Sequence, residues 1–162
     1  MTTWRAGVVT VSDRCARGEA VDESGPALVR LLEQAGYEVA TATVVPDGDE
    51  PVAGALRDAA AAGCQLVVTT GGTGLSPRDR TPEGTRAVID FEVPGLAEAM
   101  RAAGRASTPF ADLSRGLVGV TGVSIVVNVP GSVRGAVESL TTLIDVLPHA
   151  LAQLRGGDHG HG

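Results

Sequence analysis

Apolar residues recur along this chain in two patterns: short runs that suit buried strands, and longer stretches with helical spacing. Strands are expected where Val, Ile, Ala and Thr dominate a short run, at residues 6–11, 37–45, 65–70, 117–120 and 124–129. The last two runs flank Thr121-Gly122, which predicts a turn between them.

Helices are expected between these strands, at about 24–36, 51–63 and 81–90, after Pro94, and from Ser132 onward. Most of them begin at a capping residue or at a Pro, and Thr81 before Pro82 is expected to be an N-cap. The helix that begins at Ser132 is expected to be the last one, because its apolar positions form a single stripe that comprises Leu140, Leu143, Ile144, Leu147, Leu151 and Leu154.

Strands that alternate with helices predict a three-layer α/β fold, in which a mainly parallel sheet has helices on both faces. No break in composition separates two parts of the chain, so we expect a single domain over residues 1–155. The Gly- and His-rich tail at 156–162 is expected to be flexible.

Composition excludes several classes of function. The net charge of −6 and the low aromatic content of 2% disfavour nucleic-acid binding. No apolar run is long enough to span a membrane and no signal peptide is evident, which predicts a cytoplasmic protein. Cys15 and Cys64 are expected to be reduced thiols. All 13 basic residues are Arg, so no lysine of the P-loop or Schiff-base type is available.

The most informative segment for chemistry runs from Thr69 to Arg80 and follows a buried strand. Ligands of open α/β sheets bind beyond the carboxyl ends of the strands. Gly and hydroxyl residues there suit a phosphate, and Arg78 and Arg80 could pair with its oxygens. Asp79 is then a candidate Mg²⁺ ligand. A glycine turn with a solvated charged edge fits this segment equally well.

Two further segments at strand ends point the same way. Residues 128–132 combine Gly and Ser at the beginning of a helix, which is a ready anion site, although a simple capped turn also explains them. Asp47 lies in a turn after another strand. Together with Asp79 it could form the two-carboxylate Mg²⁺ site that phosphoryl and nucleotidyl transfer use.

A dinucleotide-binding fold is the main alternative, because residues 70–74 look like the glycine turn of short-chain dehydrogenases and Asp90 follows at a suitable distance. Pro77 opposes it, because it stands where the phosphate-binding helix would run. The chain also lacks the Lys that those enzymes use.

Taken together, these segments resemble the molybdopterin adenylyltransferase family, which includes the bacterial Mog enzymes and the G domains of gephyrin and plant Cnx. The resemblance runs in order from about Ala6 to Arg155. It rests on Thr10-Val11-Ser12-Asp13-Arg14, Val45-Pro46-Asp47, Thr69 to Asp79 with Thr81-Pro82-Glu83, Pro94 to Met100, Leu113-Ser114-Arg115, Asn128-Val129-Pro130-Gly131-Ser132 and Leu147-Pro148-His149-Ala150.

The resemblance implies an enzyme that adenylylates molybdopterin with ATP and Mg²⁺, is usually a homotrimer and could hand its product to a molybdenum insertase. Asp47 and Asp79 match the family's essential acidic pair. The matching nucleotide and phosphate loop comprises Thr70, Gly71, Gly72, Thr73, Gly74, Ser76 and Arg78. The surfaces that match those holding the pterin and its phosphate comprise Ser12, Asp13, Ser114, Arg115, Asn128, Pro130, Gly131 and Ser132.

Two features complicate this assignment. Arg80 stands where the family often has a small or β-branched apolar residue, and it could contact phosphate or point to solvent. The related MoaB group shares the fold, and some of its members lack the transferase activity. A non-catalytic pterin carrier or scaffold is therefore the alternative function, although the presence of both Asp47 and Asp79 favours the enzyme.

Overall fold

All six strands of the computed structural model, which describes residues 2–156, belong to one sheet in the order β2-β1-β3-β6-β5-β4. The strands are β1 (Arg5–Val11), β2 (Glu38–Val45), β3 (Leu66–Thr70), β4 (Phe91–Glu92), β5 (Val118–Thr121) and β6 (Ser124–Val129). The neighbours β2, β1, β3 and β6 pair in parallel, whereas β5 and β4 are antiparallel. This arrangement confirms the predicted, mainly parallel sheet.

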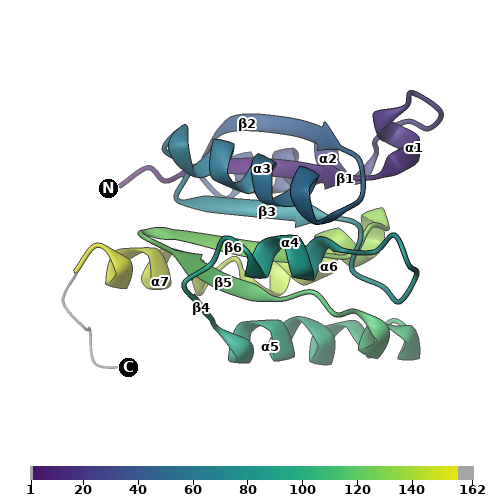
Figure 1. Ribbon diagram of the computed structural model, residues 1–162. Helices are drawn as coiled ribbons and strands as arrows, with labels where there is room; N and C mark the ends of the chain where they lie inside the picture. Colours follow the sequence, from purple (N-terminus) through teal and green to yellow (C-terminus); the bar gives the residue numbers. More distant parts are fainter. Residues whose placement is uncertain (1, 157–162) are drawn as a thin grey trace.

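Helices cover both faces of the sheet (Figure 1). They are α1 (Asp13–Ala16), α2 (Ser24–Gln34), α3 (Asp49–Ala61), α4 (Thr81–Arg86), α5 (Pro94–Gly104), the 3₁₀ helix η1 (Pro109–Leu113), α6 (Val133–Leu143) and α7 (Leu147–Leu154). Helices α3 and α4 lie over one face, and α2, α5, α6 and α7 pack on the other. Side chains of β1 alternate between the two layers: Val8 packs with α2, and Val9 packs with α3. The three-layer α/β prediction is therefore confirmed.

Parallel pairing brings four strand ends to one edge of the sheet. Val11 of β1 pairs with Val45 of β2, Thr10 pairs with Thr70 of β3, and Thr70 pairs with Val129 of β6. Because these strands run in the same direction, the loops that follow them lie side by side (Figure 1). The predicted phosphate loop, the turn with Asp47 and the Pro130-Gly131-Ser132 turn thus meet.

Three details differ from the sequence-based expectations. The apolar stripe that predicted one last helix spans two, because α6 ends at Leu143 and α7 begins at Leu147. Pro148 lacks an N–H and would clash with the preceding turn of a continuous helix. Arg80 occupies the N-cap position of α4, and Thr81 is the first helical residue. Helix α4 also ends at Arg86, four residues before Asp90, and β4 follows shortly afterwards.

The chain boundary at residue 155 stays a prediction, because residues 157–162 of the expected tail lie outside the described residues. Within residues 2–156, no helix is long and apolar enough to cross a membrane.

Candidate functional site

Two adjacent cavities lie where the four strand ends meet. The acidic cavity, of about 570 Å³, contains Asp22, Glu23, Asp47 and Asp79 and no basic side chain among its described lining residues. The apolar cavity, of about 380 Å³, lies beside it, and Ser132 lines both. Both volumes are in the range of small-molecule sites. The site can therefore hold a ligand of two chemically different parts.

The predicted site residues divide between these two cavities. Those that line the acidic cavity are Ser12, Asp47, Thr70, Gly71, Gly72, Asp79, Gly131 and Ser132. Those that line the apolar cavity are Thr73, Gly74, Ser114, Asn128, Pro130 and Ser132. The other predicted residues line neither cavity but contact the loops that line the cavities; they are Asp13, Ser76, Arg78 and Arg115.

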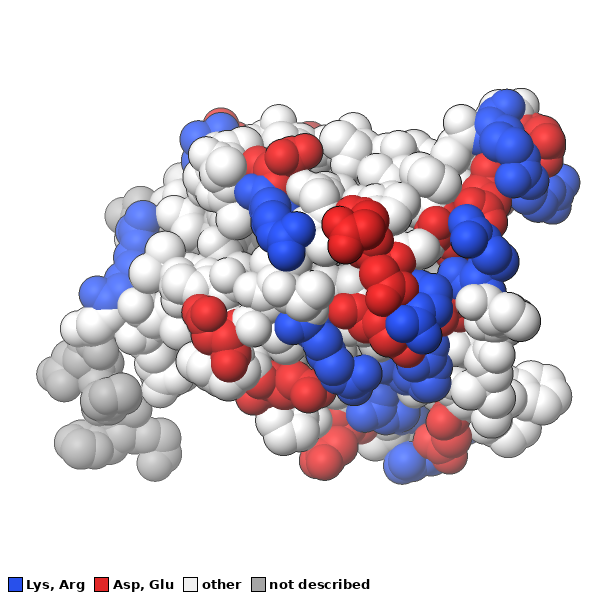
Figure 2. Space-filling model, viewed as in Figure 1, with Lys and Arg blue, Asp and Glu red and all other residues white. Residues whose placement is uncertain are grey.

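The turn that carries Asp47 is locked to the beginning of α1. Asp13 N–H donates to Asp47 Oδ2 at 2.9 Å, and Asp47 N–H donates to Asp13 Oδ1 at 3.1 Å. Arg78 holds the other side, since its guanidinium donates two 3.1 Å bonds to Asp13 and a 3.0 Å bond to the Asp47 carbonyl. Figure 2 shows such Arg and acidic side chains interleaved over this end of the sheet. Arg78 is thus paired with Asp13 at the surface.

Glycine is required at the beginning of the loop over residues 71–80, which we call the glycine loop. Gly71 and Gly72 have φ of 98° and 67°, values that other residues rarely adopt. A Cβ on Gly71 would lie 2.3 Å from the Val11 carbonyl oxygen, and one on Gly72 would lie 2.2 Å from Thr81 Oγ1. The loop therefore passes too close to β1 and α4 to carry side chains at these two positions.

The glycine loop presents unused hydrogen-bond donors. Within residues 2–156, the backbone N–H groups of Gly72, Thr73, Gly74 and Leu75 donate to no protein acceptor. Successive free N–H groups of this kind form an anion-binding concavity. The helix that a dinucleotide-binding fold would begin here starts only at Thr81, after Pro77. The loop could therefore bind phosphate oxygens, and its geometry differs from that of a dinucleotide-binding fold.

The carboxylates of the acidic cavity suit a divalent cation. Burial raises the pKa of the Asp47 carboxyl above its usual value, and the negative charges of Asp13 and Asp79 raise it further, against the opposing Asp13 N–H bond and Arg78 charge. A cation between Asp47 and Asp79 would relieve this repulsion. No group of three or more His, Cys, Asp or Glu side chains forms a metal site among the described residues. Two carboxylates are enough for Mg²⁺, which takes its remaining ligands from water and phosphate.

Arg115 and Glu83 brace the glycine loop from the side of α4. Arg115 donates to the carbonyls of Gly74 at 2.9 Å and Asp79 at 2.7 Å, and it pairs with Glu83 at 2.5 Å. Burial raises the pKa of the Glu83 carboxyl, but the bond from Arg115, a backbone N–H and the charge of Arg80 lower it more, so it lies below its usual value. Arg80 itself pairs with Asp49 at 2.7 Å at the surface, where its side chain is 44% exposed, and it lines neither cavity.

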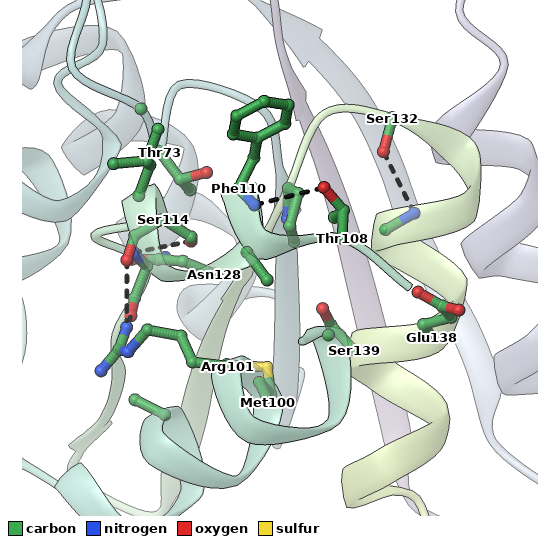
Figure 3. Close-up of a pocket in the computed structure, with 18 residues that line it drawn as sticks. Thr73, Met100, Arg101, Thr108, Phe110, Ser114, Asn128, Ser132, Glu138 and Ser139 are labelled. Atoms are coloured by element: carbon green, nitrogen blue, oxygen red, sulfur yellow. Dashed lines mark hydrogen bonds between the residues drawn. The ribbon is translucent and has the colours of Figure 1, made fainter. Parts of the chain in front are cut away.

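The apolar cavity is enclosed by α5, η1 and α6, and Figure 3 shows the Phe110 ring at its edge. Phe110 is 72% exposed although it is one of the few aromatic residues of the chain. Met100 and Leu113 add apolar surface, and Ser139 adds a hydroxyl. A flat heterocycle would be held here between apolar side chains, with polar groups at its edges.

The 3₁₀ helix η1, which carries Phe110, was not predicted from the sequence. The available signal was Thr108-Pro109, an N-cap followed by a first-turn Pro, and Thr108 Oγ1 indeed accepts a bond from Phe110 N–H at 3.2 Å. Arg101 was not predicted either. It donates to the carbonyls of Ser114 and Gly116, and all three residues line this cavity.

Asn128 is bonded inside the protein. Its side-chain N–H groups donate to Thr69 and Thr85, its carbonyl oxygen accepts from Leu117 N–H, and it is 1% exposed. Ser132 is likewise occupied at the beginning of α6, where it accepts from Gly135 N–H, as its predicted capping role requires. Contact of either residue with a pterin stays a prediction.

An α/β sheet with two cavities at its carboxyl edge, one acidic beside a glycine loop and one apolar, is typical of proteins that bind small molecules beyond the ends of parallel strands. The family described as "Probable molybdopterin binding domain" matches residues 7–149 of this chain. The chain belongs to this family, whose members function in molybdenum-cofactor biosynthesis.

Curated relatives agree with this assignment. The chain is 37% identical to the molybdopterin adenylyltransferase of Haemophilus influenzae, over 87% of this chain and 73% of the relative. It is 44% identical to a molybdenum cofactor biosynthesis bifunctional protein of Synechococcus elongatus, over 96% of this chain and 49% of the relative. The chain thus spans about half the length, or less, of several curated relatives that it matches.

Solved structures of both branches of the family are similar to this chain. The molybdopterin biosynthesis enzyme MoaB of Thermus thermophilus has a TM-score of 0.89 at 48% identity, covering 95% of this chain and 98% of that one. The molybdopterin biosynthesis Mog protein of Mycobacterium ulcerans has a TM-score of 0.89 at 46% identity, covering 96% and 99%. Overall similarity does not separate the two branches, so the chemistry of the site must.

Proposed function

We propose that this protein catalyses transfer of the adenylyl group of ATP to the terminal phosphate of molybdopterin, with release of pyrophosphate. The observation that carries the proposal is the meeting of Asp47 and Asp79 with the free N–H groups of the glycine loop, directly beside an apolar cavity. Relatives named molybdopterin adenylyltransferase over most of the chain support it.

In the proposed reaction, a phosphate oxygen of molybdopterin attacks the α-phosphorus of ATP, and the bond from that phosphorus to the bridging oxygen of the β-phosphate breaks. The nucleophile is already anionic, so no general base is needed. The difficulty is to bring two anions together and to stabilise the charge on the leaving pyrophosphate. Residues of this chain must therefore position the phosphates and offset their charge.

Each part of the site has a role in that task. The N–H groups of Gly72 to Leu75 bind phosphate oxygens, and Arg78 adds a cationic donor once it leaves Asp13. Asp47 and Asp79 would hold Mg²⁺, which would neutralise the phosphates and the leaving group. The apolar cavity, with Phe110 at its edge, binds the pterin ring and excludes water from the reacting phosphate.

ATP labelled at either the α- or the γ-phosphate tests the reaction. With the chain, molybdopterin and Mg²⁺, the α-label is expected in molybdopterin and the γ-label in pyrophosphate. Formation of ADP and phosphate would contradict adenylyl transfer. Binding of molybdopterin without any labelled product would support the carrier alternative, which the similarity to MoaB keeps open.

We further propose that the protein is a cytoplasmic homotrimer. Its product would be handed over to a molybdenum insertase. The longer relatives named bifunctional proteins join this kind of chain to a second part, which is consistent with a hand-over. Light scattering at micromolar concentration is expected to give three times the chain mass of 16.4 kDa, and a monomer mass would contradict the trimer.

A further inference from the structure

Every nitrogen of the Arg115 guanidinium has a partner within the protein. Nε donates to the Gly74 carbonyl at 2.9 Å, Nη2 to the Asp79 carbonyl at 2.7 Å, and Nη1 to Glu83 at 2.5 Å. The backbone N–H of Arg115 also donates to the Thr73 carbonyl at 2.8 Å. One residue therefore ties together the first and the last part of the glycine loop.

These bonds fix the direction of the peptide planes in the loop. The C=O and N–H groups of a trans peptide point in opposite directions, and the described chain contains no cis peptide. Because the carbonyls of Thr73 and Gly74 point at Arg115, the N–H groups of Gly74 and Leu75 point away from it. Those are two of the free donors of the loop.

The same contacts hold the loop where Asp79 lies. The Asp79 carbonyl is bound by Arg115, and its Oδ2 accepts from Ser76 N–H at 3.1 Å. A Cβ on Gly74 would lie 2.8 Å from that Oδ2, so the carboxylate sits against the loop that Arg115 orients. Arg115 is thus connected both to the phosphate donors and to a carboxylate of the acidic cavity.

Arg115 differs in this respect from Arg78. The Arg78 side chain is 65% exposed and pairs with Asp13 at the surface, so it is able to move toward a ligand. The Arg115 side chain is 34% exposed, its charge is matched by Glu83, and it lines neither cavity. Reaching a substrate phosphate would require Arg115 to give up its bonds to the loop.

We propose that Arg115 is a positioning residue that binds the carbonyls of the glycine loop so that the Gly74 and Leu75 N–H groups and Asp79 face the triphosphate of ATP, and that it does not itself touch a substrate. This inference rests on the proposed function, and it replaces the pterin-phosphate contact that the family resemblance implied for Arg115. The geometry of the guanidinium fork, rather than its charge, is what the loop uses.

The test compares Arg115→Lys and Arg115→Met with Arg80→Met. Lys keeps the charge and loses the fork, whereas Met loses both. Arg80 is the matched control, because it also lies within 3.6 Å of Glu83 but binds no carbonyl of the glycine loop. Three quantities are measured on each folded variant: NMR order parameters of the Gly74 and Leu75 N–H groups, ATP affinity by calorimetry, and KM for each substrate.

Both Arg115 variants are expected to lower the order parameters of the loop and to weaken ATP binding about 10-fold. A smaller rise in the KM for molybdopterin is expected, because Thr73 and Gly74 also line the apolar cavity. Arg80→Met is expected to change none of these. If Arg115→Met does not fold, Arg115→Lys alone carries the test. Parental loop order in Arg115→Lys, or a rise in the KM for molybdopterin alone, would overturn the proposal.

Failure of the proposed function would be visible separately. A parent chain that binds ATP but forms no adenylylated product would refute the enzyme. The order parameters and ATP affinities would still decide the role of Arg115, because neither depends on turnover.

Discussion

Asp13 and Asp47 exchange backbone-to-carboxylate hydrogen bonds of 2.9 and 3.1 Å, although 34 residues separate them. The pairing of β1 with β2 brings them together, because Val11 and Val45 are partners at the ends of these strands. The exchange fixes the Asp47 carboxylate at the wall of the acidic cavity. Arg78 completes the arrangement by its fork to Asp13.

Arg78→Met is expected to raise the KM for ATP about 10-fold with little change in Tm. The side chain is mostly exposed, and surface ion pairs contribute little to stability. Steady-state kinetics and thermal unfolding check this. Arg86→Met, which removes an exposed Arg–acid pair and lines neither cavity, is the control. An unchanged KM for ATP would remove Arg78 from the phosphate site.

Glu83→Gln is expected to lower the free energy of unfolding at neutral pH by up to about 1 kcal/mol, because it weakens the bond to Arg115. The Glu83 pKa is lowered in the folded protein, so its stabilising effect is present above the unfolded pKa and is lost as the pH falls through the folded pKa. The difference between parent and variant should therefore shrink in acid. Urea unfolding across a pH series measures it, and a difference that grew in acid would refute the sign.

Phe110→Ala is expected to raise the KM for molybdopterin about 5- to 10-fold while leaving the KM for ATP unchanged, because the exposed ring lies at the edge of the cavity proposed to bind the pterin. Val123→Ala, at an exposed apolar residue away from both cavities, is the matched control. Equal effects on the two KM values would indicate that η1 acts on the whole site rather than on the pterin.

Asn128→Ala is expected to destabilise the fold by about 2–4 kcal/mol, because it leaves Leu117 N–H and two buried threonine hydroxyls without a partner. Thr85→Val, which removes one of these bonds, should cost less. Denaturant unfolding measures both. A stable Asn128→Ala variant with a raised KM for molybdopterin would instead make Asn128 a ligand-binding residue.

The sequence was sufficient to predict five of the six strands and the meeting of the loops that follow them, because Val-rich runs with turns between them leave few other arrangements. The two-residue strand β4 (Phe91–Glu92) was not predicted, because it is too short to give a pattern. Asp47 and Asp79 could be placed in one site for the same reason: each follows a parallel strand. The roles of Arg115 and Asn128 could not be predicted. The side-chain partners of Arg115 lie 32 to 41 residues away, and the threonine partners of Asn128 lie 43 and 59 residues away. These contacts depend on register and loop geometry.

The apolar cavity could not be predicted from the pattern of hydrophobic and polar residues either. Phe110 lies in a segment without periodicity, and η1 is positioned by its contact with α5, where a Cβ on Gly104 would lie 2.8 Å from the Ala111 Cβ. The break between α6 and α7 was hidden because both helices continue the same buried stripe: Leu140, Leu143, Leu147 and Leu151 all lie in one core.

The most direct test of this account is the rate of molybdopterin-dependent pyrophosphate release from Mg²⁺-ATP by the parent, Asp47→Asn and Asp79→Asn. Both variants keep a side-chain oxygen that can accept the existing N–H bond from Asp13 or Ser76, so both should fold. We expect turnover by the parent and a loss of about 100-fold or more in each variant. Near-parental turnover in both folded variants, or none in the parent, would contradict it.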